Sequence, residues 1–156
     1  MMQEEDSILI QKVLRGDQQA FSKLVDRHKH TAFGIAYQIT ASREDAEEIA
    51  MDAFVKAYHA LGSFKGDSKF STWYYRIVYN TSISFKRKKR IEFTPLNEHL
   101  TENYSEDSFT EGLYSLNPEE RLRMVTRIME TLPGEDATLM DLFYRHEMSI
   151  EEISQI

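Results

Sequence analysis

Hydrophobic residues recur every three or four positions along most of the chain, a spacing that places them on one side of an α-helix. Four helices are predicted in the first ninety residues, each preceded by a polar capping residue. The predicted caps are Ser7, Asp17, Ser42 and Ser71. Gly16 ends the first helix, the third ends near Leu61, and the fourth continues into a run of basic residues. No segment alternates as a strand does, so the predicted fold is all-α.

The periodic pattern stops at residue 91 and resumes at Pro118, a residue that suits the first turn of a helix. The stretch between, 91–117, is rich in Glu, Asn, Ser and Thr and is predicted to be a linker. Two helices are expected after it, at about 118–132 and 137–145. Ser149 and Glu152 form a capping box for a third. The sequence thus predicts domains at 1–90 and 118–156, joined by the linker 91–117.

The third helix has a well-defined apolar face and an unusual polar face. At 100° per residue, one arc collects the core candidates Ala46, Ile49, Ala50, Ala53, Phe54, Ala57 and Leu61. The opposite arc carries Met51 and Val55 among acidic side chains. Isolated apolar residues are common on protein surfaces. An apolar centre with an acidic rim also fits a docking face for a partner, and the helical pattern alone does not decide between the two.

The fourth helix also divides into two arcs. The inward arc is predicted to hold Trp73, Tyr74, Ile77, Val78, Thr81 and Phe85, and the outward arc Tyr75, Arg76, Tyr79, Ser82, Ile83, Lys86, Arg87 and Arg90. Exposed tyrosines among cations are typical of nucleic-acid binding, because cations contact phosphates and aromatic rings stack on bases. A basic last turn also favours the helix dipole. One or two charges suffice for that, and five follow one another here, so binding is the favoured interpretation.

Charge is distributed very unevenly along this chain of net charge −7. Residues 64–90 carry eight Lys or Arg and one acidic residue, whereas residues 91–120 carry eight acidic residues and no Lys or Arg. This asymmetry indicates an element that binds a polyanion, followed by a segment that avoids or imitates one.

Several other classes of function are disfavoured. An apolar content of 41% supports a folded core, and the absence of cysteine excludes disulfides and thiolate chemistry. His28 and His30 lie on opposite sides of a helix and cannot share a metal, and no phosphate-binding glycine loop or nucleophile motif is present. We therefore expect neither an enzyme nor a cofactor. The chain start lacks the features of a signal peptide, which favours a cytoplasmic protein.

The chain resembles the extracytoplasmic-function (ECF) sigma factors of bacterial RNA polymerase. The resemblance rests on "GDQQAFSKLVDRHKHTAFGIAYQIT", on "DAEEIAMDAFVKAYHALGSFKGDSKFSTWYYRIVYNTSISFKRKKR" and on "METLPGEDATLMDLFYRHEMSIEEISQI". It implies a helical sigma-2 domain, a flexible acidic linker and a sigma-4 domain of helix-turn-helix type. In that family sigma-2 binds the β′ clamp helices of the polymerase core and opens the −10 element of the promoter.

The resemblance assigns roles to particular residues. The implied contact with core polymerase is Glu48, Met51, Asp52 and Val55. Members of the family often have Gln where Met51 stands. The implied DNA-binding residues are Phe64, Lys65, Gly66, Asp67, Ser68, Lys69, Trp73, Arg76, Tyr79, Asn80, Lys86, Arg87, Lys88, Lys89 and Arg90. The loop 64–69 and Asn80 would capture a flipped base, and Arg76 with the run 86–90 would hold phosphates.

The remaining implications concern the linker, the end of the chain and the partners. In the family the linker threads through polymerase channels that hold nucleic acid, so its carboxylates would imitate a polyanion, although acidic linkers also serve simply to stay extended. Family members continue past the position of Ile156 with a recognition helix for the −35 element, which this sequence lacks. A module held by an anti-sigma factor, itself an expected partner, and a general nucleic-acid-binding helical protein are the alternative functions.

Overall fold

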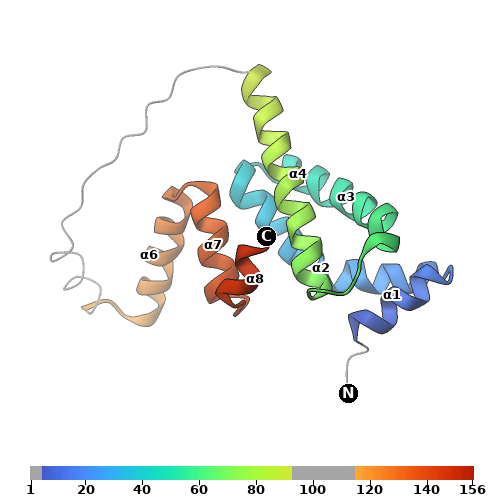
Figure 1. Cartoon of the computed structure of the whole chain (residues 1–156). Coiled ribbons are helices and arrows are strands. Elements are labelled where there is room, and N and C mark those ends of the chain that lie inside the picture. The colour runs from blue at the N-terminus through green and yellow to red at the C-terminus, as the bar shows by residue number, and fades with distance from the viewer. Residues whose placement is uncertain (1–4, 93–114) are drawn as a thin grey trace.

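Helices make up all the regular structure in the parts of the chain that the computed structural model describes, residues 5–92 and 115–156. Figure 1 shows their arrangement. In chain order they are α1 (Asp6–Leu14), α2 (Gln18–Thr40), α3 (Arg43–Ala60), the 3-10 turn η1 (Leu61–Ser63), α4 (Phe70–Glu92), α6 (Pro118–Thr131), α7 (Gly134–Tyr144) and α8 (Ile150–Ser154). The all-α prediction is confirmed. The predicted linker lies almost wholly outside the described residues.

Short polar sequences between the helices set where several of them begin. The Asp17 carboxylate accepts hydrogen bonds from the backbone N–H groups of Gln19 and Ala20, at 2.9 and 3.2 Å. Ser42 caps α3 through the N–H of Asp45, and Ser149 forms the expected capping box with Glu152. Each cap pairs a helix-end donor that would otherwise be left to water.

Three predicted helix starts were wrong. Glu5, not Ser7, precedes α1, and Ser71 lies inside α4, which begins at Phe70. The Lys69 carbonyl accepts the first helical hydrogen bond of α4, from the N–H of Trp73 at 3.2 Å. Helix α7 begins at Gly134, three residues before the predicted start, with Pro133 as its N-cap residue.

The core lies where α2, α3 and α4 pack against one another, with α1 lying across α2 (Figure 1). All seven residues of the core arc predicted for the third helix are buried. Tyr74 of α4 is fully buried and stacks on Phe54 of α3 at a ring separation of 4.6 Å. Aromatic packing of this kind adds to the stabilisation from apolar burial. The three helices therefore form a firm platform for the surfaces described below.

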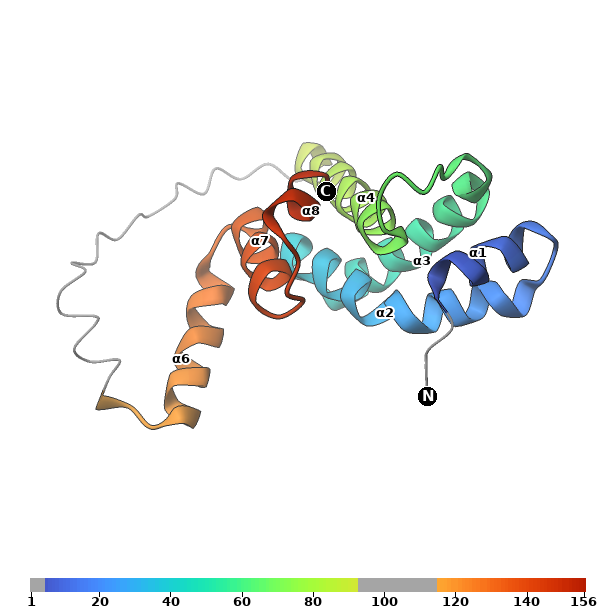
Figure 2. The same cartoon turned by 60° about the horizontal axis from the view of Figure 1, so that its bottom comes forward.

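Helix α7 packs on the C-terminal half of α2, so the C-terminal helices share the core of the first four. Leu142 and Met148 belong to the same buried cluster as the residues of α2, α3 and α4. Figure 2 shows α7 beside α2 and α8 close to α4.

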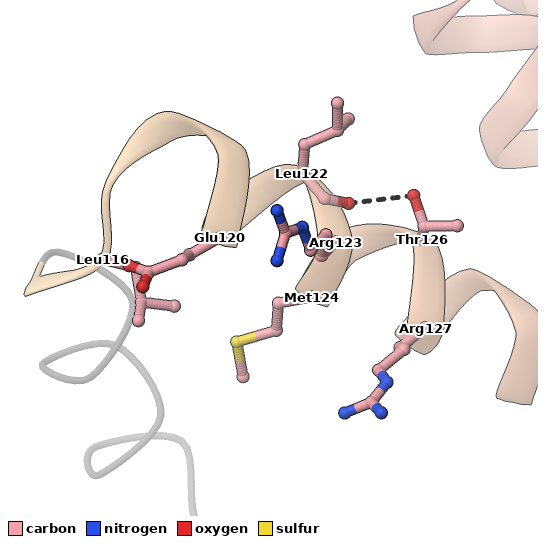
Figure 3. Close-up of a pocket in the computed structure, with 7 residues that line it drawn as sticks. All are labelled: Leu116, Glu120, Leu122, Arg123, Met124, Thr126 and Arg127. Carbon is pink, nitrogen blue, oxygen red and sulfur yellow. Dashed lines mark hydrogen bonds between the residues drawn. The ribbon is translucent and has the colours of Figure 1, made fainter.

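Helix α6 behaves differently from the others, because none of its residues is buried. Its apolar positions occur at the predicted spacing, yet Leu122 is 69% exposed. With Met124, Arg123 and Arg127 it lines an open hollow along the helix (Figure 3).

Although α2 and α4 each have 23 residues, no helix in the described parts is apolar enough over that length to cross a membrane.

Candidate nucleic-acid interface

The candidate interface begins in the loop 64–69 that connects η1 to α4. Gly66 has a φ of 77°, a conformation that glycine adopts without strain. Phe64 is half-buried and its ring lies 5.1 Å from that of Trp73 and 6.1 Å from that of Phe70. This aromatic cluster fixes the base of the loop. The polar side chains of the loop are directed to solvent, and Lys65, Gly66, Asp67 and Lys69 are all exposed.

The exposed face of α4 continues from the loop toward the basic run. Arg76, Asn80, Ser84 and Arg87 are exposed and are three or four residues apart, so they form one row along the helix. Asn80 lies ten residues beyond Phe70, about 15 Å along the axis at 1.5 Å per residue. Asn80 thus lies on the same helix as the start of the loop surface but farther along it. The pocket of the loop 64–69 with Asn80 stays a prediction.

The outward arc predicted for α4 was partly wrong. Tyr75 and Ser82 are buried, at 6% and 0% exposure, and Tyr79 is half-buried. The helix contacts both α2 and α3, so its buried side is wider than the single arc of a surface helix. Ser82 satisfies its hydroxyl by donating to the Val78 carbonyl of its own helix, at 2.8 Å. The exposed surface is consequently cationic and amide-bearing, with less aromatic area than the sequence indicated.

A buried hydrogen-bonded group that sequence reasoning missed holds α4 in place. His28 of α2 contacts Asp6 Oδ2 of α1 through Nε2, at 2.8 Å, and the Tyr75 hydroxyl of α4 through Nδ1, at 3.1 Å. Partial burial opposes ionisation of Asp6, but the hydrogen bond and charge of His28 and the adjacent Arg27 lower its pKa below 3.8. Burial raises the pKa of Tyr75, which stays a phenol. In the sequence, the position of His28 on the apolar face of α2 was the feature that could have indicated a buried, hydrogen-bonded histidine.

The basic run Lys86–Arg90 is fully exposed at the far end of α4. Its members are not equivalent, because the Lys89 ammonium forms an ion pair with Asp45 at the start of α3. That contact fixes the end of α4 on α3 and leaves Lys89 less available to an external phosphate. Lys86, Arg87 and Lys88 extend the exposed row of Arg76 and Asn80 and carry its positive charge.

The outer face of α3 presents the second candidate surface. Met51 is 68% exposed and Val55 53% exposed, and both are bordered by the exposed Glu48 and Asp52. Asp52 forms an ion pair with Lys56 one turn on, at 2.8 Å. Tyr58, also exposed at 43%, adjoins this apolar centre and was missed because its spacing resembles that of core residues. Two apolar side chains, Met51 and Val55, and the Tyr58 ring provide surface area that a partner could bury.

Metal chemistry has no support in the described residues, where no group of three or more His, Asp or Glu side chains is placed to hold an ion. His28 and His30 do not share a site, since the ring nitrogens of His28 are both occupied by Asp6 and Tyr75.

Comparison with known proteins identifies the family. Residues 24–91 match the family model "Sigma-70 region 2". The ECF RNA polymerase sigma-E factor of Escherichia coli (strain K12) is 33% identical over 159 aligned residues, which cover 97% of this chain and 82% of that protein. The chain belongs to the ECF sigma factors. The RNA polymerase sigma-H factor of Pseudomonas aeruginosa is 44% identical over 82 residues, 53% of this chain and 42% of that one. These names are those of transcription factors and point to a non-enzyme, in agreement with the sequence-based expectation.

Two solved structures resemble this ECF sigma factor. An engineered region 2 of sigmaE in complex with GTAAAA aligns with a TM-score of 0.53 and 38% identity, over 60% of this chain and 99% of that one. CnrH in complex with the cytosolic domain of CnrY aligns with a TM-score of 0.50 and 25% identity, over 98% of this chain and 90% of that one. The first resemblance covers the candidate interface, and the second covers nearly all of the chain.

Proposed function

We propose that this ECF sigma factor directs RNA polymerase to promoters, through contacts made by two separate faces of residues 1–90. The outer face of α3 would bind the β′ clamp helices of the core enzyme, and the loop 64–69 with the exposed row of α4 would bind and open the −10 element. Residues 91–117 would act as the acidic linker and residues 118–156 as a partial sigma-4 domain. Recognition of a −35 element is not part of this proposal.

The exposed row of α4 is the observation that carries the proposal. Arg76, Asn80 and Arg87 are exposed in line, and the loop 64–69 leads directly into their helix. Region 2 of sigmaE, which resembles this part of the chain, was solved in complex with GTAAAA. A guanidinium or ammonium group contacts phosphate in any sequence, whereas an amide donates to and accepts from a base edge. Asn80 is therefore the proposed reader of sequence and the cations hold the backbone.

The loop would receive a base removed from the stack. Extruding a nucleotide costs a few kcal/mol, and a partner must offset this by stacking and hydrogen bonding. The half-buried rings of Phe64 and Trp73 provide an apolar wall, and the exposed Lys65 and Lys69 provide charge for the adjoining phosphates. Such a site favours strand opening because it binds the extruded base and not the paired one.

Transcription in vitro tests the proposal directly. Core RNA polymerase would be supplied with this chain and with a set of templates that differ only in the −10 element. We expect transcripts that depend on the chain and vary with the element. Equal output from all templates would indicate a general nucleic-acid-binding protein instead.

A second candidate function is supported by one of the resemblances. CnrH, which aligns over 98% of this chain, was solved with the cytosolic domain of CnrY. A protein partner that covers the same faces would make this chain a sequestered module, held by an anti-sigma factor. Co-purification distinguishes the two states, because core polymerase and a small inhibitor would be recovered in separate complexes.

A further inference from the structure

The C-terminal helices lie against the surface proposed to bind DNA. Lys69 Nζ of the loop forms an ion pair with Glu152 Oε1 of α8, at 2.7 Å. This contact and the Ser149 backbone lower the pKa of Glu152. Both views of the molecule show α8 close to α4 (Figures 1 and 2).

Tyr79 lies farther along α4 and is half-buried. Burial raises the pKa of Tyr79, and the negative charge of Glu135 in the first turn of α7 raises it further. The direct contact between the candidate DNA surface and the C-terminal helices is the ion pair of Lys69 with Glu152. Ile153 and Ile156 pack, partly buried, against the shared hydrophobic core.

Gly134 makes this arrangement sterically demanding. A Cβ atom at this position would lie 2.6 Å from the Gln38 carbonyl oxygen and 2.7 Å from the Ile39 Cα of α2. Both neighbours are backbone atoms of a long helix, so they cannot move aside as a side chain can. The first turn of α7 therefore approaches α2 as closely as it does only because residue 134 has no side chain.

We infer that α7 and α8 dock on α2 and the start of α4 as an autoinhibitory element, which occludes the part of the −10 surface around Lys69. This inference rests on the proposed function. The Glu152 carboxylate of α8 occupies the position at Lys69 that a DNA phosphate would take. Both ligands thus compete for one surface, and DNA binding requires that the helices leave.

The ion pair is the weaker part of the docked arrangement, whereas apolar packing of Leu142 and Met148 holds the C-terminal helices on the core. The Lys69 side chain is 75% exposed in the ion pair, and an exposed pair is weak and screened by salt. Apparent affinity for DNA falls in proportion to the fraction of molecules in the competent state. A modest bias toward the docked state therefore reduces binding without abolishing it, and a change that undocks the helices restores it.

The test is the substitution Gly134→Ala in the full chain, with Gly34→Ala as its matched control. Gly34 lies within α2 and a Cβ there meets nothing within 4 Å, so the control makes the same chemical change without a clash. Because the sequence has no cysteine, the pair S84C and S154C allows spin labels to be placed on α4 and α8 alone. Glu152→Gln is a second variant, since Gln keeps the capping box and removes the charge that pairs with Lys69.

The distance between the labels is measured on the doubly labelled proteins. The affinity for a fluorescent single-stranded oligonucleotide that carries GTAAAA, beside a scrambled one, is measured on the same variants with Ser84 and Ser154 intact, because Ser84 belongs to the proposed DNA-binding row. For Gly134→Ala we expect a longer, broader distance distribution and about tenfold tighter binding of GTAAAA. Glu152→Gln should change both quantities in the same direction and less, and Gly34→Ala neither.

Each contrary outcome has a distinct meaning. An unchanged label distance in Gly134→Ala and Glu152→Gln would overturn the docking. A longer distance with unchanged affinity and a retained preference for GTAAAA would overturn the occlusion alone. Equal affinity for GTAAAA and the scrambled oligonucleotide in every protein would contradict the proposed function, and the inference would fall with it.

Discussion

His28 illustrates how single side chains position the candidate interface. Its two ring nitrogens reach Asp6 on α1 and Tyr75 on α4, so one imidazole joins three helices in the interior. The ionised Asp6 carboxylate can only accept, which makes Nε2 the donor to it, while Nδ1 is paired with the Tyr75 hydroxyl. A buried network that satisfies its members in this way fixes one arrangement of the helices.

Asp6→Ala should destabilise the fold by about 1–3 kcal/mol at neutral pH, because it leaves the buried His28 Nε2 without its partner. The pKa of Asp6 is lowered in the folded state, so its contribution is present above the ordinary value of 3.8 and is lost as the pH falls through the folded value. Urea unfolding of the variant and the parent at a series of pH values measures this.

Asp26→Ala is the matched control, since Asp26 is exposed and pairs with the exposed Lys29, so its loss should have little effect on stability. If Asp6→Ala and Asp26→Ala were equally stable, the network would not contribute to the fold. A difference from the parent that persists unchanged well below pH 3.8 would show that it does not arise from the Asp6 carboxylate.

Asn80→Ala removes a donor and an acceptor from the exposed row of α4 but no charge. We expect it to reduce discrimination among bases at one −10 position by about 1–3 kcal/mol, tenfold to a hundredfold or more, with the salt dependence unchanged. A competition assay on single-stranded −10 oligonucleotides with each base at each position measures this. Ser22→Ala, an exposed polar residue on α2 and outside the row, is the control. An equal loss for all oligonucleotides would contradict the role of Asn80.

At the scale of elements, the sequence could predict those features of a helix, such as its cap and its buried face, that depend on residues close to it along the chain. The caps Asp17 and Ser42 and the whole buried arc of α3 were correct, since both follow from local hydrogen bonding and a 3.6-residue period. Tyr75 and Ser82 were placed on the wrong side of α4, because the period does not show that the helix packs on two partners. Gly134 was left outside the predicted helix 137–145, because the requirement for glycine there arises from its close approach to α2, far away in sequence.

In the basic run at the end of α4, the cations Lys86, Arg87 and Lys88 should each contribute to DNA binding by neutralising a phosphate. Replacing Lys86, Arg87 and Lys88 by Gln should weaken promoter binding uniformly across sequences. It should also flatten the dependence of log affinity on log salt, by roughly 0.9 for each duplex phosphate that is no longer neutralised, or about 0.7 on a single strand. Binding titrations at several salt concentrations give the slope.

Lys89→Gln is the natural comparison, because the Lys89 ammonium is bound to Asp45 and its replacement should change the slope less than Lys88→Gln does. If the triple substitution left the slope unchanged, the basic run would not contact DNA.

At the scale of the whole molecule, charge and shape separate the two proposed contacts. The chain carries a net charge of −7, and the cationic stretch 64–90 is where the sequence concentrates the positive charge that attracts DNA. The exposed apolar centre of α3 bears acidic neighbours and would repel DNA while accepting a protein. The family and the all-α fold could be predicted from sequence. The packing of α7 and α8 on the first four helices could not, because it depends on interactions between distant segments.

Capture of promoter DNA by core polymerase tests the central claim most directly. The template is a labelled fork junction with a single-stranded −10 element, and the proteins are the parent, Met51→Asp and Asn80→Ala. Leu14→Asp is the control, since Leu14 is an exposed apolar residue on a different helix, α1.

We predict that core polymerase captures the template only when the chain is present, and in preference to a scrambled element. Met51→Asp should abolish capture while its thermal stability stays that of the parent, because the side chain is 68% exposed. Asn80→Ala should keep capture but lose the preference, and Leu14→Asp should behave as the parent does. Capture that is independent of the chain, or equal for the scrambled template, would contradict the account.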